Sequence, residues 1–383
     1  MMKWKRAAAL ILARVMTAGC VLPALAMEKP DDMDDAAWAR LQDNRLEYDE
    51  IENRVTYYSP TYRTVVDQVD LNVAPVQTAI NDLKDEIKDI REDARYARDD
   101  DDMITYNVNM AMAKAYEDQA LKPLETALRR ADHSTKSVKD PIRRSLVSGI
   151  QKLMIGYHQA MASKELTDTA VELAEAAYQS TVSQRDIGMA TDTDVQSAEK
   201  SVLSAKSQQQ SLTKTIDNVR QNLCTMTGWA YNASPEIGEI PEPDMAEIDA
   251  MNPEQDLAKA ISYNPDIIEL RATSGRGDFN RNQKFRSLDE TEAKLKTKLQ
   301  SLYETVLGSR TAYEAAANAY ESAKLTMNGN DLRYQMGMLG KLEYLQAKTG
   351  YLQSKMTYDM AKLSLKQAME DYQWALYGVV ELE

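Results

Sequence analysis

The chain has 383 residues and a formal net charge of −14, and 28% of its residues are charged. So acidic a chain is a poor candidate for nucleic-acid binding. Only 2 Phe and 4 Trp accompany 20 Tyr and 20 Met, a composition that favours long helices with narrow apolar stripes over one large dry core. Because no series of short alternating strands is present, the sequence also argues against a β-sandwich or barrel.

The N-terminus has the features of a secretory signal peptide. Its first six residues carry three basic side chains, an apolar stretch follows, and Ala24-Leu25-Ala26 is an A-x-A cleavage site. Cys20 lies in a segment that resembles a lipoprotein signal, so lipidation stays open, as does an uncleaved membrane anchor. We expect residues 1–26 to be removed and the mature chain to be exported to the cell envelope, in a periplasmic or other extracytoplasmic location.

A leader segment follows the cleavage site. Apolar residues at helical spacing predict one leader helix over 34–57, within a leader segment of 27–58. Ser59 and Pro60 then have the residue types of an N-cap and a first helical position. A new helix is therefore expected to begin at this point.

The next helix carries a heptad seam over 66–97, in which apolar residues alternate at three and four positions. Pro75 lies inside the seam and is expected to kink the helix without ending it. The run Asp99–Asp102 is interpreted as a turn and the N-cap of the following helix; a calcium loop is an alternative, but EF-hand spacing is absent. A long helix is predicted over 141–185.

A glycine then interrupts the helical pattern. Gly188 precedes a helix that Asp192 or Thr193 can cap, and the seam of that helix runs over 195–223. Gly228 ends this helix. The first half of the chain thus contains a long helix, a glycine turn and a second long helix.

The second half repeats this order. Residues 230–252 hold three prolines and a glycine and are expected to form a linker. Asn252-Pro253 and Asn264-Pro265 each have the residue types of a cap and a first helical position. The apolar period lapses over 274–286, and long seams over 295–320 and 344–375 then flank the glycine at position 337.

The two glycine breaks belong to one duplicated unit. Residues 185–189 match residues 334–338, and the same offset of 149 residues carries Asp194 onto Glu343. Both following seams begin seven residues after their glycine. Such a duplication indicates helical hairpins that stack side by side in a tandem architecture.

This unit resembles the repeat of the TolC-type outer membrane efflux proteins. The shared features are the glycine turn, the acidic residue and a long helix rich in Ala, Gln and Leu that ends at glycine, over 185–228 and again over 334–378. The family also begins a repeat with an Asn-Pro helix start, which 257–267 matches closely and Ser59-Pro60 more faintly. The resemblance covers residues 59–378.

In that family, three chains form a helical tunnel whose glycine turns make the tip that meets an adaptor or pump. The resemblance therefore implies that Gly188 and Gly337 are tip turns and that Asp194 and Glu343 are tip acids near a constriction. It implies that Tyr334 helps to hold a closed tip. It also implies self-association as a trimer, with a membrane-fusion adaptor or an export pump as partner.

The chain departs from the family in two respects. Leu339 and Gln346 stand where the family often has an arginine and a second acid, which puts a gate locked by polar links in doubt. The places that would hold the family's strand hairpins, 99–102 and 274–286, are too short or lack alternation. We therefore expect an all-α, elongated coiled-coil bundle of long antiparallel helices, made of two tandem TolC-like repeats without a transmembrane β-barrel. The expected parts are a signal peptide (1–26), a leader helix (27–58), a first helical repeat (59–229), a linker (230–252) and a second helical repeat (253–383).

The sequence offers no catalytic constellation. His133 and His158 are the only histidines, neither has the spacing of a metal ligand or a catalytic base, and no phosphate loop is present. We expect no enzyme, no cofactor and no metal. Two functions remain: a TolC-like export or efflux component that forms a helical conduit, or a non-transporting envelope scaffold or surface spacer. In either case Gly188 and Gly337 are expected at one end of the rod, close in space.

Overall fold

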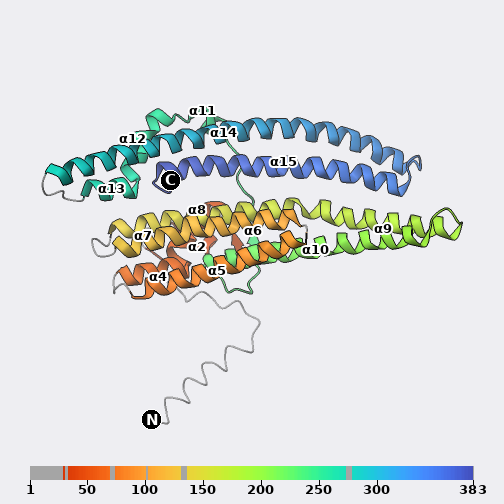
Figure 1. Ribbon diagram of the computed structural model, residues 1–383, viewed down its shortest axis with the longest axis horizontal. Coiled ribbons are helices and arrows are strands. Elements are labelled where there is room, and N and C mark those ends of the chain that lie inside the picture. The colour runs from red at the N-terminus through yellow and green to blue at the C-terminus, as the bar shows by residue number, and fades with distance from the viewer. Residues whose placement is uncertain are drawn as a thin grey trace, which may run out of the picture.

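A computed structural model shows an elongated, almost wholly helical molecule (Figure 1). The described residues are 29–30, 33–69, 74–100, 102–130, 136–272 and 278–382. The expected signal peptide, Cys20 included, and His133 lie outside them. The all-α class predicted from the sequence is confirmed. Over the described ranges, no helix combines the length and apolar character that crossing a membrane requires.

The leader segment is not the single helix that its periodicity predicts. The Asp43 side chain accepts a hydrogen bond from the Arg45 N–H at 2.8 Å, and this turn separates a first helix from a short strand. The strand pairs in parallel with two residues of the linker. The apolar spacing survives the break because Leu41 and Leu46 on either side of it are both buried. The elements are α2 (Asp35–Leu41), β1 (Arg45–Leu46), η1 (Tyr48–Glu50) and α3 (Ile51–Tyr58), with the pairing strand β2 (Glu236–Ile237).

Arg54 of α3 fastens the leader to the first repeat. Its side chain is 3% exposed, donates to the Leu41 carbonyl at 2.9 Å and lies 3.4 Å from the centroid of the Trp229 ring. Burial lowers the pKa of Arg54 to about 10, so the guanidinium stays charged at neutral pH. The linker is held as well, because His158 Nε2 donates to the Gly238 carbonyl at 2.8 Å.

The first repeat begins with α4 and α5, where the sequence predicts one helix with a kink at Pro75. Residues 70–73 between these two helices lie outside the described part of the chain, so the kinked continuation stays a prediction. Asp102 caps α6 by accepting from the Thr105 N–H at 3.1 Å, in agreement with the sequence. The elements are α4 (Pro60–Val69), α5 (Ala74–Asp99), α6 (Met103–Tyr116), the π-helical segment η2 (Glu117–Leu121), α7 (Lys122–Arg130), α8 (Lys136–Ala162), α9 (Lys164–Asp186) and α10 (Asp192–Met226).

The second repeat begins at the two predicted Asn-Pro starts. Asn252 and Asn264 each accept hydrogen bonds from two N–H groups of the helix that follows. α14 has 58 residues and is about 87 Å long at the usual helical rise. It already includes residues 278–286, where the sequence shows no apolar period. The period is absent there because the described side chains of this stretch are mostly exposed. The elements are α11 (Met245–Ala250), α12 (Pro253–Tyr263), α13 (Pro265–Ala272), α14 (Asp278–Gln335) and α15 (Lys341–Leu376).

Glycines with a left-handed backbone end the long helices α9, α10, α14 and α15, with φ between 71° and 87°. Two of them, Gly228 and Gly378, also lie against the residue just before a predicted helix start, Ser59-Pro60 and Asn264-Pro265 respectively. A Cβ on either would lie 2.2 Å from a backbone carbonyl oxygen, that of Tyr58 or Tyr263 respectively. Each repeat therefore closes on itself through the same contact, and the two tandem repeats are confirmed.

The first repeat contains a helical hairpin that the second lacks. Within the described ranges, the chain forms α4, α5, α6, η2 and α7 after Pro60 and before the long α8–α9 stretch, whereas after Pro265 only α13 precedes α14. α5 and α6 pack against each other, and α6 packs against α8 (Figure 1). The largest apolar core forms between these helices, and its buried side chains include Leu83, Ile87, Ile90, Val108, Leu146, Ile150 and Leu153.

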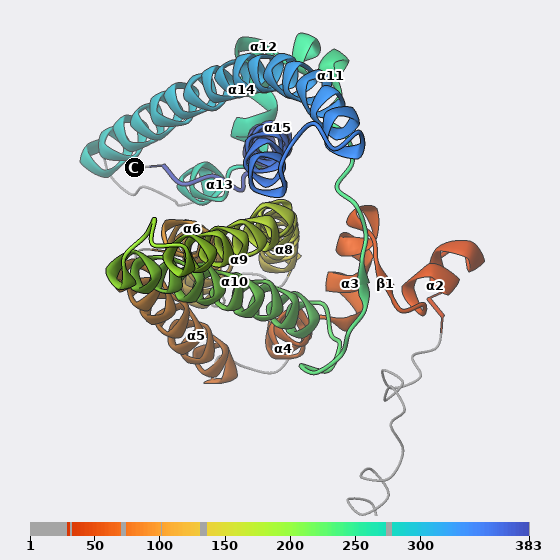
Figure 2. The same cartoon turned by 90° about the vertical axis from the view of Figure 1, so that its right-hand side faces the viewer.

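The two repeats meet where α15 packs against α8 and α9 (Figure 2). Trp374 Nε1 donates to Gln151 Oε1 at 2.7 Å across this interface. Lys152 and Asp371 form an ion pair at 2.7 Å, with both side chains largely buried. The interface is therefore polar as well as apolar, and its hydrogen bonds fix the register of α15 on α8.

The closing contacts predict an order among glycine substitutions. Gly228→Ala is expected to lower the free energy of unfolding by about 2–5 kcal/mol, because it combines left-handed strain with a clash against a backbone carbonyl. Gly188→Ala also has a positive φ, but open space surrounds it, so about 1–2 kcal/mol is expected. Gly308→Ala, inside α14 with open space, should stabilise by about 0.5–1 kcal/mol. Urea unfolding measures all three, and a Gly228 effect no larger than that of Gly188 would contradict the contact.

Candidate functional site at the hairpin turns

The turns α9–α10 and α14–α15 have the same backbone design. In each, the residue after the glycine donates its N–H to the carbonyl four residues before the glycine, at 2.7 Å (Met189 to Gln184) and 2.8 Å (Met338 to Arg333). Both turns lie at the same end of the molecule in Figure 1, but Figure 2 shows them apart across that end. The expected proximity of Gly188 and Gly337 within one chain is therefore not found.

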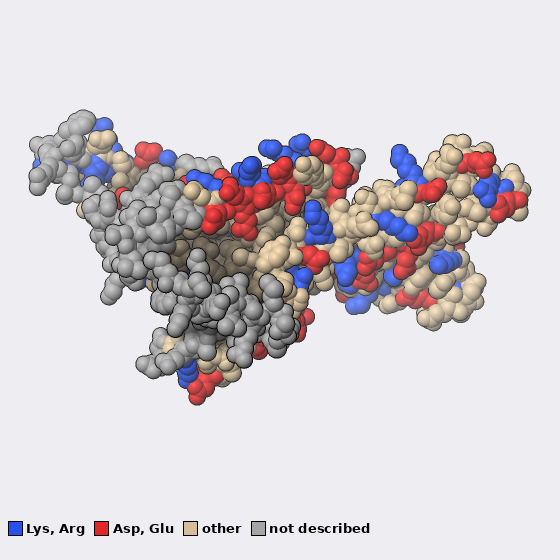
Figure 3. All heavy atoms as spheres, turned by 90° about the horizontal axis from the view of Figure 1, so that it is seen from below, with Lys and Arg blue, Asp and Glu red and all other residues tan. Residues whose placement is uncertain are grey.

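Apolar side chains flank both turn glycines and face solvent. Ile187 is 71% exposed and Met189 77%, and in the other turn Met336 is 65% exposed and Met338 67%. The face drawn in Figure 3 carries interspersed charges of both signs over its described part. The glycines predict the two turns but not the exposed apolar residues beside them; the Met that follows each glycine is the sequence feature that indicates these.

Asp194 has a structural role at the first turn. Thr191 is the N-cap of α10, where Asp192 or Thr193 was expected, and it forms a reciprocal capping box with Asp194. Asp194 Oδ2 accepts from the Thr191 N–H at 2.8 Å, and Thr191 Oγ1 accepts from the Asp194 N–H at 3.2 Å. These hydrogen bonds lower the pKa of the Asp194 carboxyl below its ordinary value.

Glu343 occupies the equivalent position of α15 without such a partner. The N-cap there is Gly340, which has no side chain to accept a hydrogen bond. The Glu343 side chain is exposed and has no hydrogen-bond or ion-pair partner among the described residues. The duplicated acids therefore differ: one carboxylate is fixed by its cap, and the other is open to solvent.

Tyr334 belongs to a ladder of tyrosines between α14 and α15. Its ring stacks on that of Tyr344, with centroids 4.2 Å apart. Farther along the hairpin, the Tyr320 and Tyr351 hydroxyls are hydrogen-bonded at 3.2 Å, and the hydrogen bond raises the pKa of Tyr351 to about 12. Tyr358 continues the ladder by stacking on Tyr320. Tyr334 thus contributes to holding its own hairpin together.

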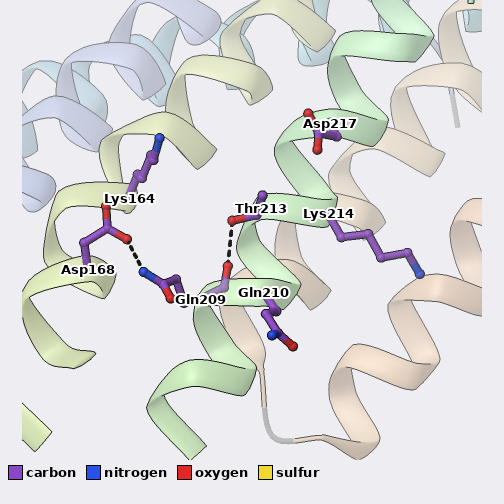
Figure 4. Close-up of a pocket in the computed structure, with 7 residues that line it drawn as sticks. All are labelled: Lys164, Asp168, Gln209, Gln210, Thr213, Lys214 and Asp217. Carbon is purple, nitrogen blue, oxygen red and sulfur yellow. Dashed lines mark hydrogen bonds between the residues drawn. The ribbon is translucent and has the colours of Figure 1, made fainter. Parts of the chain in front are cut away.

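Polar side chains join the two helices of the first hairpin, α9 and α10. Gln209 Nε2 of α10 donates to Asp168 Oδ1 of α9 at 2.7 Å (Figure 4). These two side chains line a shallow surface groove of about 570 Å³, together with Lys164, Thr213 and other polar side chains. Buried aliphatic side chains, among them Val171, Val195 and Leu212, accompany this polar pair in the first hairpin, whereas stacked tyrosines join the helices of the second.

None of these groups forms a catalytic arrangement. In the part of the chain that the structure describes, no three or more His, Cys, Asp or Glu side chains are placed to hold a metal ion. Burial lowers the pKa of His158, whose ring is already bonded to a backbone carbonyl. Cys224 is buried, and burial raises the pKa of its thiol. The features with functional promise are the exposed turns.

Comparisons with known proteins show what the fold is similar to. No family model matches the chain, and no curated protein matches its sequence. Similar solved structures include the CmeC outer membrane channel of Campylobacter jejuni (14% identity, TM-score 0.44, covering 70% of this chain and 69% of that one). A membrane protein from Pseudomonas aeruginosa (15%, 0.49, 94% and 98%) and CusC (14%, 0.48, 78% and 97%) are also similar. At these identities the likeness concerns the fold alone.

The capping box predicts a pH-dependent effect. Because the folded pKa of Asp194 is lowered, its stabilisation is present above the unfolded carboxyl pKa of about 3.9 and is lost as pH falls through the folded value. Asp194→Asn should therefore lower the free energy of unfolding at neutral pH and have little effect in acid. Denaturant titrations at both pH values measure this. Glu343→Gln is the matched control: it removes a charge from a helix N-terminus but no capping hydrogen bond, so its effect at neutral pH should be the smaller one. Equal effects of the two variants would contradict the capping role.

The tyrosine ladder predicts a difference between two Phe substitutions. Tyr351→Phe removes a hydroxyl that is hydrogen-bonded to Tyr320, so a loss of about 1 kcal/mol in unfolding free energy is expected. Tyr334→Phe keeps the stacked ring, and no hydrogen bond of its hydroxyl is seen among the described residues, so it should be nearly neutral. Thermal unfolding compares the two, and equal losses would show that the hydroxyl pair does not contribute.

Proposed function

We propose that the mature chain is a TolC-like component of an export or efflux system of the cell envelope, in which it forms part of a helical conduit. The observation that carries the proposal is the duplicated hairpin, whose two turns present four exposed Ile and Met side chains at one end of a heavily charged protein. Each turn thus offers a pair of exposed apolar side chains, and a partner that contacts both turns would remove four of them from water. The turns are thus suited to docking on a partner.

The proposed partner is a membrane-fusion adaptor or an export pump that meets the tip. Gly188 and Gly337 shape the two turns, and the flanking apolar side chains supply the area to be buried. Glu343, which is open to solvent, can pair with a cation of the partner, whereas Asp194 stays with its cap. In this proposal Tyr334 stiffens the second hairpin and does not lock a gate.

Self-association is the second part of the proposal, with a trimer as the state that the resemblance implies. Large apolar side chains are exposed on the hairpin helices as well as at the turns: Leu203 of α10 is 63% exposed, Leu325 of α14 72% and Leu332 of α14 59%. Leu325 and Leu332 are seven residues apart and share one face of α14. That face is suited to packing on a second copy of the chain.

A non-transporting envelope scaffold is the second candidate, and the stiffness of the second hairpin favours it. A 58-residue helix paired with α15 through stacked tyrosines is what a spacer rod requires. A spacer, unlike a conduit, has no need to form a ring. The oligomeric state of the mature chain therefore separates the two functions.

Sedimentation of the mature chain at micromolar concentration tests the conduit. A closed oligomer is expected, and Leu325→Glu with Leu332→Glu should convert it to folded monomers, because each new carboxylate would be buried at the contact without a partner. Thr297→Glu, at an exposed position in the other half of α14, is the matched control and should leave the oligomer intact. A wild-type chain that stays strictly monomeric would reject the conduit and leave the scaffold.

A further inference from the structure

The turn between α14 and α15 brings two tyrosine rings together beside a carboxylate. Tyr334 lies near the end of α14 and Tyr344 in the first turn of α15, and their ring centroids are 4.2 Å apart with the ring planes inclined by only 15°. The next closest aromatic rings in the described part of the chain, those of Tyr320 and Tyr358, are 5.2 Å apart. The Tyr344 hydroxyl also donates a hydrogen bond to Asp331 Oδ1 at 3.0 Å. Two phenols and one proton acceptor thus meet at one place.

The fold of the turn does not require this cluster. The offset of 149 residues that relates the two turns places Val182, Arg185 and Val195 at the equivalent positions of the first turn. That turn forms the same backbone hydrogen bond after its glycine, although these residues supply neither a ring pair nor a carboxylate. The second turn therefore carries a chemical arrangement that the reversal of the chain can do without.

Asp331 makes Tyr344 the easier of the two tyrosines to oxidise. A phenol that loses an electron also loses its proton, because the oxidised phenol is a strong acid. The Asp331 carboxylate lies within hydrogen-bond reach of that proton, and no Lys or Arg of the described residues forms an ion pair with it. Farther along the hairpin, the Tyr320 and Tyr351 hydroxyls face only each other, and a neutral hydroxyl is a much poorer base than a carboxylate.

Tyr334 supplies a second ring that an oxidant can reach. Its side chain is 39% exposed, and its hydroxyl has no hydrogen-bond partner among the described residues, so phenylalanine would fill the same space. The unpaired electron of an oxidised tyrosine lies in an orbital perpendicular to the ring plane. Because the rings of Tyr334 and Tyr344 are stacked and nearly parallel, the orbitals that would form a bond between them face each other.

We propose that Tyr334 and Tyr344 are a site of oxidative crosslinking, at which a peroxidase with its peroxide joins the two rings as dityrosine. Each ring gives up one electron and its phenolic proton, and Asp331 accepts the proton of Tyr344. The ring carbons beside the two oxygens then form a carbon–carbon bond. Each of these carbons releases its hydrogen as a proton, and each oxygen takes one up, which restores both phenols. Two hydrogen atoms are lost in all, and one peroxide is reduced to two molecules of water.

The product joins the end of α14 to the beginning of α15 by a covalent bond across the turn. The bond closes a short loop, so its effect on the unfolded chain is small, and its main consequence is a turn whose two helices cannot separate. The exposed Met336 and Met338 would then be presented on a fixed hairpin. The crosslink concerns this hairpin alone, so it is independent of whether the mature chain is a conduit or a scaffold.

The test oxidises the full mature chain with light, a ruthenium tris-bipyridyl complex and persulfate, which together act as a one-electron oxidant. Trypsin places Tyr334 and Tyr344 in adjacent peptides, 334–341 and 342–348, neither of which contains another tyrosine. The expected product is these two peptides joined, with a mass two hydrogen atoms below their sum. Products with oxygen added to the methionines of the first peptide are counted with it. Only the monomer band of a denaturing gel is analysed, which excludes bonds between chains.

Three variants assign the groups. Tyr334→Phe keeps a stacked ring but should abolish the joined peptide. Asp331→Asn keeps an acceptor for the Tyr344 hydroxyl but cannot take up its proton, so the joined peptide should form several-fold more slowly while the near-ultraviolet circular dichroism is unchanged. Tyr96→Phe is the matched control for exposure: Tyr96 is 63% exposed and no aromatic ring of the described residues packs on it, so its loss should leave the yield unchanged.

The linked peptides also contain the outcome that would overturn the proposal. Other pairs of the tyrosine ladder lie in other tryptic peptides, so each pair is counted separately. If the joined peptide is no more abundant in the wild type than in Tyr334→Phe, or if bonds between other tyrosines predominate, the site is wrong. An equal rate in Asp331→Asn and the wild type would reject the transfer of the proton to Asp331.

Discussion

The structure depends on one contact made twice, in which a glycine at the end of a repeat lies against the backbone at its beginning. Gly228 meets the carbonyl of Tyr58, and Gly378 meets that of Tyr263. A backbone carbonyl cannot rotate away as a side chain can, so this contact fixes where the last helix of each repeat ends. From there α10 and α15, of 35 and 36 residues, run to their turns over about 53 Å. Equal closures and equal helices therefore place both turns at the same end, without any contact between the turns themselves.

The same closure leaves the two hairpins in unequal surroundings. The inserted hairpin α5–α7 gives the first repeat its own apolar core, and α9 is additionally covered by α15. The α9–α10 seam can therefore be partly polar, as the pairing of Asp168 with Gln209 shows. Much of α14 is paired with α15 alone, and its seam has to bury area within the hairpin. Tyrosine provides that area while its hydroxyl finds a partner across the seam, as between Tyr320 and Tyr351.

The features that could be predicted from the sequence are those that depend on interactions between residues close together in the chain. The glycine turns, the heptad seams and the Asn caps depend on residues within one or two helical turns, and each was found near its expected place. The division of the leader into several short elements was not predicted, because a single Asx turn at Asp43 ends the first helix without disturbing the apolar spacing of the sequence. The sequence did not predict the helical structure at the beginning of α14, because a helix whose side chains are mostly exposed has no apolar stripe in its sequence. The insertion of α5–α7 could not be recognised, because its heptads resemble those of the repeat that contains it. At the tip, Thr191 acts as the cap in place of its acidic neighbour, because a reciprocal box with Asp194 also satisfies the N–H of the cap residue itself.

The difference between the two turns comes down to one residue at the N-cap. Thr191 in the first turn has a hydroxyl that draws Asp194 into a closed box, and Gly340 in the second has none, so the Glu343 carboxylate stays in solvent. Both carboxylates lie at a helix N-terminus, where a negative charge is favoured, but only one is free to leave it for a partner. In a trimer, the tip would present the two turns in alternation, each with exposed Ile or Met side chains, and with a free acid only at every second position. A partner that docks on all turns by apolar contact would then distinguish the two kinds by charge. Under the proposed docking, the duplication would provide one end of the molecule with two recognition surfaces on a common backbone.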